Sequence, residues 1–317
     1  MMRLSQDQLD FFDREGYLVV EDVLTDADLQ PVINEITAKI DEISKKLVAE
    51  GALSRDYAEE DFEHRLAKIS RETDAVHNAI WSGTLSGPAF FDLIRHDTLL
   101  DVAEQFCGPE LIASSVYRLR PKVPSYHRSP VPWHQDSGYF EPYCDDALVL
   151  TMWIPLVDAN ETNGCLWVIP RAHKGAVVRH VNIEGKPYLH ILDEDLPRTC
   201  EPVCAEVRKG GVLLLSNKTP HASFENNTDA VRYSMDLRYQ SAKLPTNAPI
   251  SRLEGEIIGV EGGEVPIACY PPEADFLVRS KARPHEVVTD PATFHRIRSE
   301  HQGAGLSRRW ETLPANA

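Results

Sequence analysis

The chain has 317 residues, of which 42% are hydrophobic and 26% are charged. This composition is typical of a folded globular protein and excludes disordered, collagen-like and coiled-coil chains. The sequence contains 33 Lys and Arg residues against 49 Asp and Glu residues, so its formal net charge is −16. Such an excess of negative charge disfavours general binding to nucleic acids and to anionic membranes.

No segment of the sequence is expected to cross a membrane. The longest apolar run, residues 148–157, contains a proline and is shorter than the roughly 18–20 residues that a spanning helix needs. Residues 1–17 are acidic and lack the apolar core of a signal peptide. Among the scattered cysteines, Cys200 and Cys204 lie close together but lack the second close pair that a zinc site needs. We therefore expect a cytoplasmic protein with reduced thiols.

The N-terminal part of the sequence predicts a helix, a strand and a longer helix. Ser5 and Gln8 have the spacing of a capping box at the start of the first helix, which Gly16 ends. Residues 17–20 form a short apolar run that is typical of a strand. Thr25 opens the long helix, whose apolar residues recur at three- and four-residue steps and so describe one buried face. These residues are Leu29, Val32, Ile33, Ile36, Ile40, Ile43 and Leu47.

A change in sequence texture separates residues 50–110 from the β-rich region that follows. The first of these segments is polar, with a helix expected at 97–106. From residue 112, short apolar runs separated by Gly, Pro, Asn and Asp predict an antiparallel β-sandwich or jelly roll. The predicted strands are residues 112–119, 147–154, 165–169, 203–207, 211–216 and 231–239. Residues 241–290 are rich in Pro and Gly and are expected to cover the sheet as loops.

The C-terminal part predicts one more helix. Asp290 and Pro291 make a favourable N-cap and first-turn pair, and the helix is expected to run to about His301. No internal repeat or clear linker interrupts the sequence, so one domain is the economical interpretation. It would span residues 1–317, with a helical N-terminal part (1–110), a jelly-roll core (111–240) and C-terminal loops and helix (241–317).

The segment 133–140 contains two residues that suit a metal ion. His134 and Asp136 are two residues apart, so on a strand their side chains would point to the same face. They would then offer an imidazole nitrogen and a carboxylate oxygen to one divalent cation. This spacing alone is weak evidence, because about one His-x-Asp is expected by chance in such a composition. A solvated pair in a loop is the alternative.

His221 and Arg232 lie on consecutive predicted strand regions. His221 follows the buried run 211–216, and Arg232 opens an alternating strand. The polar turn at residues 226–229 would close a hairpin that brings the arginine beside the histidine. Two histidines and one carboxylate form the facial triad that leaves positions open on Fe(II). A guanidinium nearby suits a dicarboxylate co-substrate, which it can bind through paired hydrogen bonds.

Four segments of the chain resemble the phytanoyl-CoA dioxygenase family of Fe(II)/2-oxoglutarate-dependent oxygenases. They are LSQDQLDFFDREGYLVVEDVLTDADL, WHQDSGYF, LTMWIPLVDANETNGCLWVIPRAHKG and PHASFENNTDAVRYSMDLRY. The segments occur in the order typical of the family, and the resemblance covers most of the chain. It implies a mainly β fold with flanking helices and a double-stranded β-helix, or jelly-roll, core of the cupin-like kind.

The resemblance also implies the residues of the site. The catalytic metal ligands of the family fall on His134, Asp136 and His221. The positions that bind or adjoin 2-oxoglutarate fall on Arg232, Ser223, Gln135 and Trp153. Many relatives carry a lysine before the metal-binding strand, where this chain has Arg120.

The activity implied by the resemblance is the hydroxylation of a small molecule. Fe(II), O₂ and 2-oxoglutarate would take part, and succinate and CO₂ would be released. Because related halogenases have Gly or Ala in place of the carboxylate, Asp136 favours hydroxylation over halogenation. Desaturation, cyclisation or oxidative cleavage at the same iron is an alternative. A non-catalytic metal-binding jelly-roll module is the alternative from another class.

The sequence does not assign a single role to several basic residues and histidines. The basic residues before the metal strand either meet an anionic substrate or line a solvated strand edge; they are Arg118, Arg120, Lys122 and Arg128. Three further histidines have no partner visible in the sequence and are expected at the surface or in turns. They are His127, His173 and His180.

Overall fold

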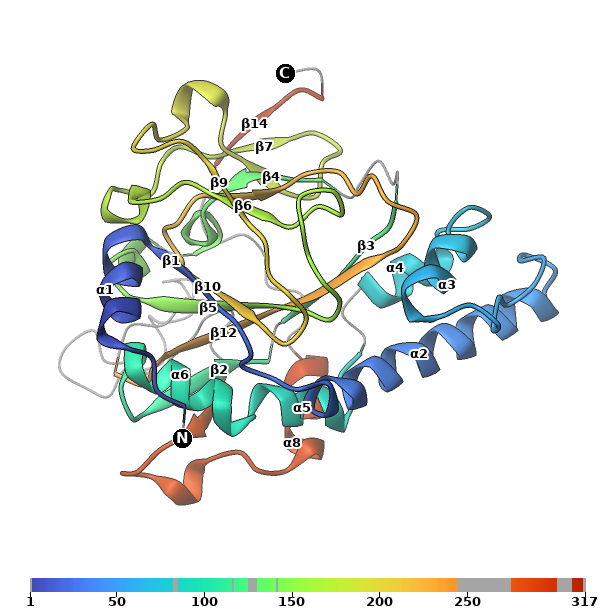
Figure 1. Ribbon diagram of the computed structural model, residues 1–317, viewed down its shortest axis with the longest axis horizontal. Helices are drawn as coiled ribbons and strands as arrows, with labels where there is room; N and C mark the ends of the chain where they lie inside the picture. The colour runs from blue at the N-terminus through green and yellow to red at the C-terminus, as the bar shows by residue number, and fades with distance from the viewer. Residues whose placement is uncertain are drawn as a thin grey trace.

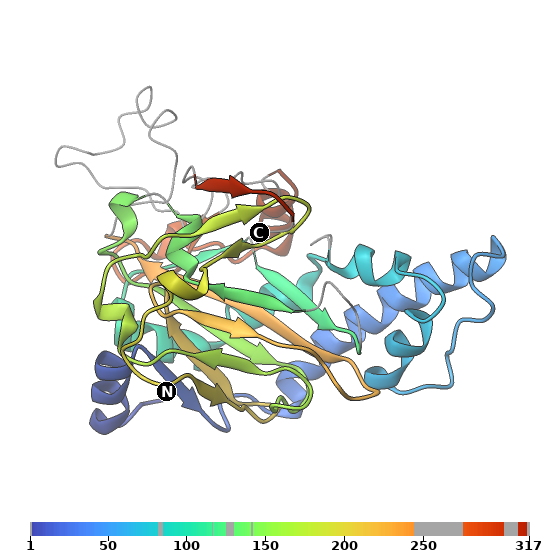
Figure 2. The same cartoon turned by 90° about the horizontal axis from the view of Figure 1, so that it is seen from above.

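Two antiparallel β-sheets face each other at the centre of the protein, and helices cover the larger one (Figures 1 and 2). The computed structural model describes residues 2–81, 85–115, 117–124, 130–140, 142–243, 275–300 and 310–315. This arrangement confirms the predicted mainly β fold with flanking helices and a jelly-roll core.

Seven strands of the described residues form the larger sheet, in the order β1-β10-β5-β12-β2-β13, with β3 added to β12. Their bounds are β1 Tyr17–Val20, β2 Leu111–Ser114, β3 Arg118–Lys122, β5 Val149–Pro155, β10 Val212–Ser216, β12 Arg232–Ser241 and β13 Asp275–Arg279. The long strand β12 pairs on one side with β5 and on the other with β3 and then β2. Strand β12 therefore joins β2 and β3 to β5 within the sheet.

The smaller sheet has the order β4-β11-β6-β9 in the described part of the chain. Its strands are β4 Val131–His134, β11 His221–Ser223, β6 Leu166–Val168 and β9 Val203–Ala205. A third, peripheral sheet has the order β14-β7-β8, with β14 parallel to β7. Its strands are β7 Val181–Ile183, β8 Leu189–His190 and β14 Glu311–Leu313.

The helices lie mainly against the outer face and one end of the larger sheet (Figure 1). They are α1 Gln6–Glu15, α2 Asp26–Ala49, α3 Phe62–Ile69, α4 Ala75–Trp81, α5 Pro88–Ile94, α6 Asp97–Cys107 and α8 Pro291–Glu300. Helix α6 packs on β2, β5 and β12, and α4 packs on β3. None of the helices in the described ranges has the length and apolar character needed to cross a membrane.

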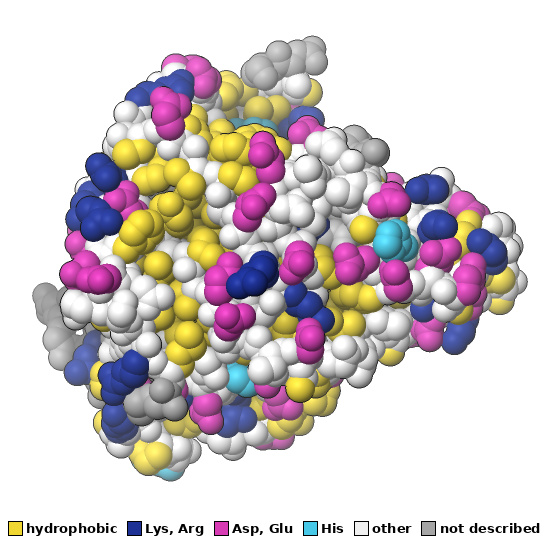
Figure 3. Space-filling view, in the orientation of Figure 1, with side chains coloured by type: hydrophobic (Ala, Val, Ile, Leu, Met, Phe, Trp, Pro, Cys, Tyr) yellow, Lys and Arg dark blue, Asp and Glu magenta, His cyan; other side chains and the backbone are white. Residues whose placement is uncertain are grey.

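The sequence predictions for α1, β1 and α2 are confirmed. Both capping boxes are present, at Ser5 and at Thr25. Of the predicted apolar face of α2, the residues from Leu29 to Ile40 are buried, whereas Ile43 and Leu47 are only partly covered. The reason is visible in Figure 1, where the C-terminal half of α2 projects beyond the sheets together with α3. On this projecting end, acidic and basic side chains are interspersed (Figure 3).

Several predicted boundaries are wrong. The run 112–119 is split into β2 and β3, and the 241–290 segment, expected to form loops, contributes strand β13. Residues 244–274 of that segment, and His301, lie outside the described residues. The larger sheet also extends past the expected core limits of 111–240, because β1 and β13 pair with β10 and β2.

The hairpin predicted between His221 and Arg232 is also wrong. Strand β11 belongs to the smaller sheet and β12 to the larger one, so the chain crosses from one sheet to the other between them. The buried Asn226 stabilises this crossing, because its side-chain amide donates to the carbonyl oxygens of Lys122 and Ala230. The two residues consequently face each other across the sandwich and do not lie side by side on one sheet.

Gly16 provides a test of the packing between the end of α1 and two residues that lie near it, His173 and Thr219. It ends α1 with φ 84°, and a Cβ there would overlap His173 Nδ1 and lie 2.7 Å from Thr219 Oγ1. Gly16→Ala should lower the free energy of unfolding by about 2–4 kcal/mol, from left-handed strain and overpacking together. Urea denaturation measures this loss.

Gly51→Ala is the matched control, because Gly51 also has a positive φ, of 71°, but nothing lies within 4 Å of its added Cβ. It should cost only the strain of about 1–2 kcal/mol. Equal losses in the two variants would contradict close packing at Gly16.

Candidate metal centre

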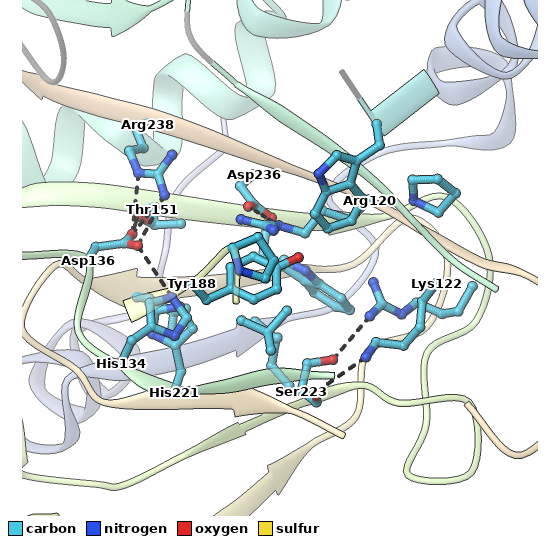
Figure 4. Close-up of a pocket in the computed structure, with 18 of the residues that line it drawn as sticks. Arg120, Lys122, His134, Asp136, Thr151, Tyr188, His221, Ser223, Asp236 and Arg238 are labelled. Carbon is cyan, nitrogen blue, oxygen red and sulfur yellow. Dashed lines mark hydrogen bonds and ion pairs between the residues drawn. The ribbon is translucent and has the colours of Figure 1, made fainter. Parts of the chain in front are cut away.

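His134, Asp136 and His221 converge at one point between the two sheets (Figure 4). One ligand atom from each residue lies within 4.8 Å of the others, and all three side chains are buried. In the described ranges, no other group of three or more His, Cys, Asp and Glu side chains has such an arrangement. The separation is suited to a single cation held by two nitrogens and one oxygen.

Strand pairing brings the two histidines together. His134 ends β4 and His221 begins β11, and the two residues are direct partners in the antiparallel register. Their ring centroids are 4.2 Å apart. Asp136 is not on the strand, as the sequence had suggested, but opens a short 3₁₀ turn, Asp136–Tyr139. The intervening Gln135 has an extended backbone (φ −107°, ψ 139°), so the side chains on either side of it still point to the same face.

Backbone carbonyls fix the orientation of both imidazole rings. Nδ1 of His134 lies 2.9 Å from the carbonyl oxygen of Pro132, and Nδ1 of His221 lies 3.0 Å from that of Thr219. A carbonyl oxygen can only accept, so each Nδ1 carries the proton and donates it. Each Nε2 then has a free lone pair, which is the form of imidazole that binds a metal.

Asp136 is kept ionised by its surroundings. Arg238 donates to both carboxylate oxygens, at 3.1 Å each from Nη2, and Thr151 Oγ1 donates to Oδ2 at 2.8 Å. Burial favours the neutral acid, but the charge and hydrogen bonds of Arg238 outweigh it and hold the pKa of Asp136 well below its usual range. Burial, and then the neighbouring His221, lowers the pKa of His134. Both ligands are therefore deprotonated near neutral pH, as metal binding requires.

A cavity of about 120 Å³ extends from these three residues between the sheets (Figure 4). Ser223, Trp153 and Arg232 also line it. Arg232 is 2% exposed and begins β12, on the sheet opposite the two histidines. The cavity is thus lined by metal-binding atoms and, on the opposite sheet, by a buried cation.

Arg232 is held by groups from both sheets. Its Nη2 donates to the carbonyl oxygen of Gly164 at 2.9 Å and to Ser223 Oγ at 3.3 Å, and Nη1 donates to Ser234 Oγ. The guanidinium carbon lies 5.1 Å from the ring centroid of Trp153. Burial lowers the pKa of Arg232 to about 10, so the side chain is still a cation at neutral pH. A fixed, buried cation of this kind can bind a carboxylate.

Lys122 is a second basic group in this part of the cavity. Its Nζ donates to the carbonyl oxygens of Ser223 and Phe224, at 3.3 and 2.6 Å. Burial, followed by the nearby Arg232 and Arg120, lowers its pKa to about 6. The sequence analysis had singled out Arg120 at the position where many relatives carry a lysine, and the structure places both Arg120 and Lys122 along the cavity.

Gln135 is not among the residues that line the cavity. Its side-chain amide donates to the carbonyl oxygen of Lys218 and accepts from the backbone N–H of Val178. Its own backbone N–H donates to Nε2 of His180. His180 was expected at the surface or in a turn; it lies outside the helices and strands but is fully buried, so the surface alternative is wrong. These contacts make Gln135 and His180 supports for the segment that carries the metal-binding residues.

Of the other two histidines, His173 is partly buried and its Nε2 lies 3.0 Å from the carbonyl oxygen of Asp13, while His127 lies outside the described residues. The sequence analysis missed Arg238 and Thr151. A signal for Arg238 was available, because it follows Arg232 at even spacing along one strand and therefore shares its face. Nothing in the sequence around Thr151 distinguishes it from a core residue.

Comparisons with known proteins agree with the predicted family. Residues 12–234 match the family model described as Phytanoyl-CoA dioxygenase (PhyH). The peroxisomal phytanoyl-CoA dioxygenase of Homo sapiens is 25% identical over 271 residues, which are 81% of this chain and 75% of the human protein. A probable alpha-ketoglutarate-dependent hypophosphite dioxygenase of Stutzerimonas stutzeri is 25% identical over 242 residues, or 75% of this chain and 79% of that protein.

Two solved structures share the fold. The apo form of the non-heme monooxygenase ThoJ has a TM-score of 0.52 and 19% identity, covering 76% of this chain and 79% of its own. EvdO2 from Micromonospora carbonacea var. aurantiaca, solved with 2-oxoglutarate, has a TM-score of 0.50 and 20% identity, covering 76% of this chain and 92% of its own.

The geometry predicts that Asp136 contributes to the binding of a divalent metal. Asp136→Ala should weaken Co(II) binding by at least about 100-fold, because the loss of groups that merely orient metal ligands already costs 10–100-fold. Calorimetric titration of the metal-free protein measures the affinity. Asp193→Ala removes an exposed carboxylate from a 3₁₀ turn and should leave the affinity unchanged. Similar Co(II) affinities in the two variants would place the metal elsewhere.

Proposed function

The chain belongs to the phytanoyl-CoA dioxygenase family and is therefore a dioxygenase; we propose that it hydroxylates an unactivated C–H bond of a small molecule in an Fe(II)- and 2-oxoglutarate-dependent reaction that releases succinate and CO₂. The observation that carries this proposal is the meeting of His134, Asp136 and His221 in one cavity with the buried Arg232.

The residues present fit a divalent iron. Two neutral imidazole nitrogens and one ionised carboxylate oxygen form the set that leaves positions open for further ligands on Fe(II). Each histidine is already in the required tautomer, and Asp136 has a pKa far below neutral. The chemistry supplied by bound iron and 2-oxoglutarate is the reduction of O₂, coupled to the conversion of 2-oxoglutarate to succinate and CO₂.

The protein's own residues would bind and orient the co-substrate. We assign Arg232 and Ser223 to the carboxylate of 2-oxoglutarate that is remote from the metal, because they offer a cation and a hydroxyl in the same buried corner. Trp153 lies against the guanidinium and limits its movement. Gly164 contributes its carbonyl oxygen to Arg232, which keeps the guanidinium directed across the sandwich. Burial of this corner excludes water from the reacting groups.

Hydroxylation is preferred to halogenation. A carboxylate occupies the third ligand position at Asp136, and Arg238 and Thr151 hold it in place. It leaves no room there for the halide that a halogenase needs. Desaturation, cyclisation and oxidative cleavage use the same ligand set, so the substrate decides among them. The relatives reported above are named for substrates as different as phytanoyl-CoA and hypophosphite.

We also propose that residues 1–317 form one oxygenase domain. Strands β1 and β13 lie on either side of the expected core in the sequence, yet both pair within the larger sheet. Helix α4, from the N-terminal part, contributes His77 and Trp81 to the cavity. The N-terminal part therefore helps to build the site.

The test of this function is the formation of succinate. Protein loaded with Fe(II) without oxygen, then given 2-oxoglutarate and air, should release succinate slowly even without a substrate. Arg232→Ala should raise the 2-oxoglutarate concentration for half-maximal rate by about 10–100-fold, because a charge-assisted contact is lost. Its Co(II) affinity should be unchanged.

Arg208→Ala is the matched control, since Arg208 is exposed on the surface. Its 2-oxoglutarate requirement should equal that of the wild type. A non-catalytic metal-binding module would bind metal but form no succinate and show no 2-oxoglutarate binding. An unchanged 2-oxoglutarate requirement in Arg232→Ala would contradict the assignment of the arginine.

A further inference from the structure

A second hollow adjoins the metal centre on the side away from Arg232. Its volume is about 290 Å³, and it shares His134, Asp136 and Arg238 with the first cavity. The two hollows therefore open onto the same metal-binding atoms. Trp81 and Tyr188 form an aromatic wall, with ring centroids 6.2 Å apart in an edge-to-face arrangement. Arg118 also lines this second hollow.

Basic residues dominate the inner face of the adjacent strands β3 and β12. Side chains two residues apart on a strand share a face, which places Arg118, Arg120 and Lys122 of β3 together. The register pairs these three with Asp236, Ser234 and Arg232 of β12, and Arg238 continues the same face. Four arginines, Lys122 and one carboxylate thus occur along this face. The chain as a whole carries a net charge of −16, so this face runs against the overall composition.

The cations of this face differ in their partners. Arg120 is paired with Asp236 at 2.6 Å, and Arg238 is paired with Asp136 at 3.1 Å. Arg232 is assigned above to the co-substrate. The side chain of Arg118 has no hydrogen bond or ion pair with any residue in the described ranges. Among the arginines that line the second hollow, Arg118 is therefore the one available to bind a ligand.

The surroundings of Arg118 increase the need for a negative partner. Burial, and to a smaller extent the charge of Arg118, lowers the pKa of Arg298, so a like charge lies near. The Asp136 carboxylate, which also lines the hollow, is already shared between Arg238 and the proposed metal. On the visible surface, by contrast, acidic and basic side chains are interspersed (Figure 3). An unpaired guanidinium in a partly buried hollow is stabilised by a bound oxyanion.

We propose that the substrate carries an oxyanion group, a carboxylate or a phosphonate-type group, and that Arg118 binds this group in the hollow beside the metal centre. The inference rests on the proposed function and names its class of substrate. Arg118 is partly exposed, so it can meet the anion as it enters from solvent. The wall of Trp81 and Tyr188 then contacts the apolar part of the molecule. Such a substrate would have one end fixed while its C–H bond lies toward His134 and Asp136.

Small anions test the proposal without knowledge of the substrate. The probes are acetate and methylphosphonate, titrated calorimetrically into Co(II)-loaded protein that is saturated with 2-oxoglutarate. At least one probe should bind saturably, and the comparison of the two shows whether the site prefers a carboxylate or a phosphonate. Arg118→Gln should weaken that binding by at least about tenfold, and Arg118→Lys by less, because it keeps the charge but not the paired donors.

Two controls locate the effect. The 2-oxoglutarate affinity of Arg118→Gln should match that of the wild type, which shows that the co-substrate corner is intact. Arg198→Gln, at an exposed arginine, should leave probe binding unchanged. Absence of saturable binding by both probes, or equal binding in Arg118→Gln and wild type, would overturn the proposal. Failure of the proposed function would appear separately, as a protein that does not bind 2-oxoglutarate.

Discussion

The site depends on two hydrogen bonds between imidazole rings and the backbone. His134 and His221 each donate Nδ1–H to the carbonyl oxygen of the residue two positions earlier. Because those residues are direct partners on β4 and β11, the pairing turns both Nε2 lone pairs toward one point. His180 likewise donates Nδ1–H to the carbonyl oxygen of Val178, and its Nε2 accepts from the backbone N–H of Gln135. Gln135 lies in the sequence between the ligands His134 and Asp136. The backbone therefore sets the geometry of the two histidine ligands.

The sandwich architecture then joins this point to the rest of the cavity. Strand β12 lies opposite the histidines, and its alternate residues face inward from Arg232 to Arg238. At about 3.3 Å per residue, these two arginines are roughly 20 Å apart along the strand. The first residue of β12 therefore supplies the buried cation assigned to the co-substrate, and Arg238, further along the same strand, holds the Asp136 carboxylate. A single strand in this way spans the space in which both co-substrate and substrate are proposed to bind.

The sequence was informative wherever local chemistry decides the structure. Capping residues and apolar periodicity predicted α1, β1 and α2, and the short motifs around His134 and His221 identified the residues that meet. The sequence was misleading where sheet membership matters, because the turn after Ser223 resembles a hairpin turn although the chain changes sheets there. The sequence also could not predict roles that depend on neighbours in three dimensions. Gln135 was expected near the co-substrate, but its side chain forms hydrogen bonds with the backbone of Lys218 and Val178. The contact of Arg238 with Asp136 likewise joins residues that are far apart in sequence.

The central claim is that one iron is bound by His134, Asp136 and His221 and that 2-oxoglutarate extends from it to Arg232. A crystal structure of the protein prepared without oxygen with Fe(II) and 2-oxoglutarate tests it most directly. The account predicts a single anomalous iron peak within bonding distance of both Nε2 atoms and an Asp136 oxygen, with the remote carboxylate on Arg232 and Ser223. Iron at other residues, or that carboxylate bound at Arg118 instead, would contradict the account.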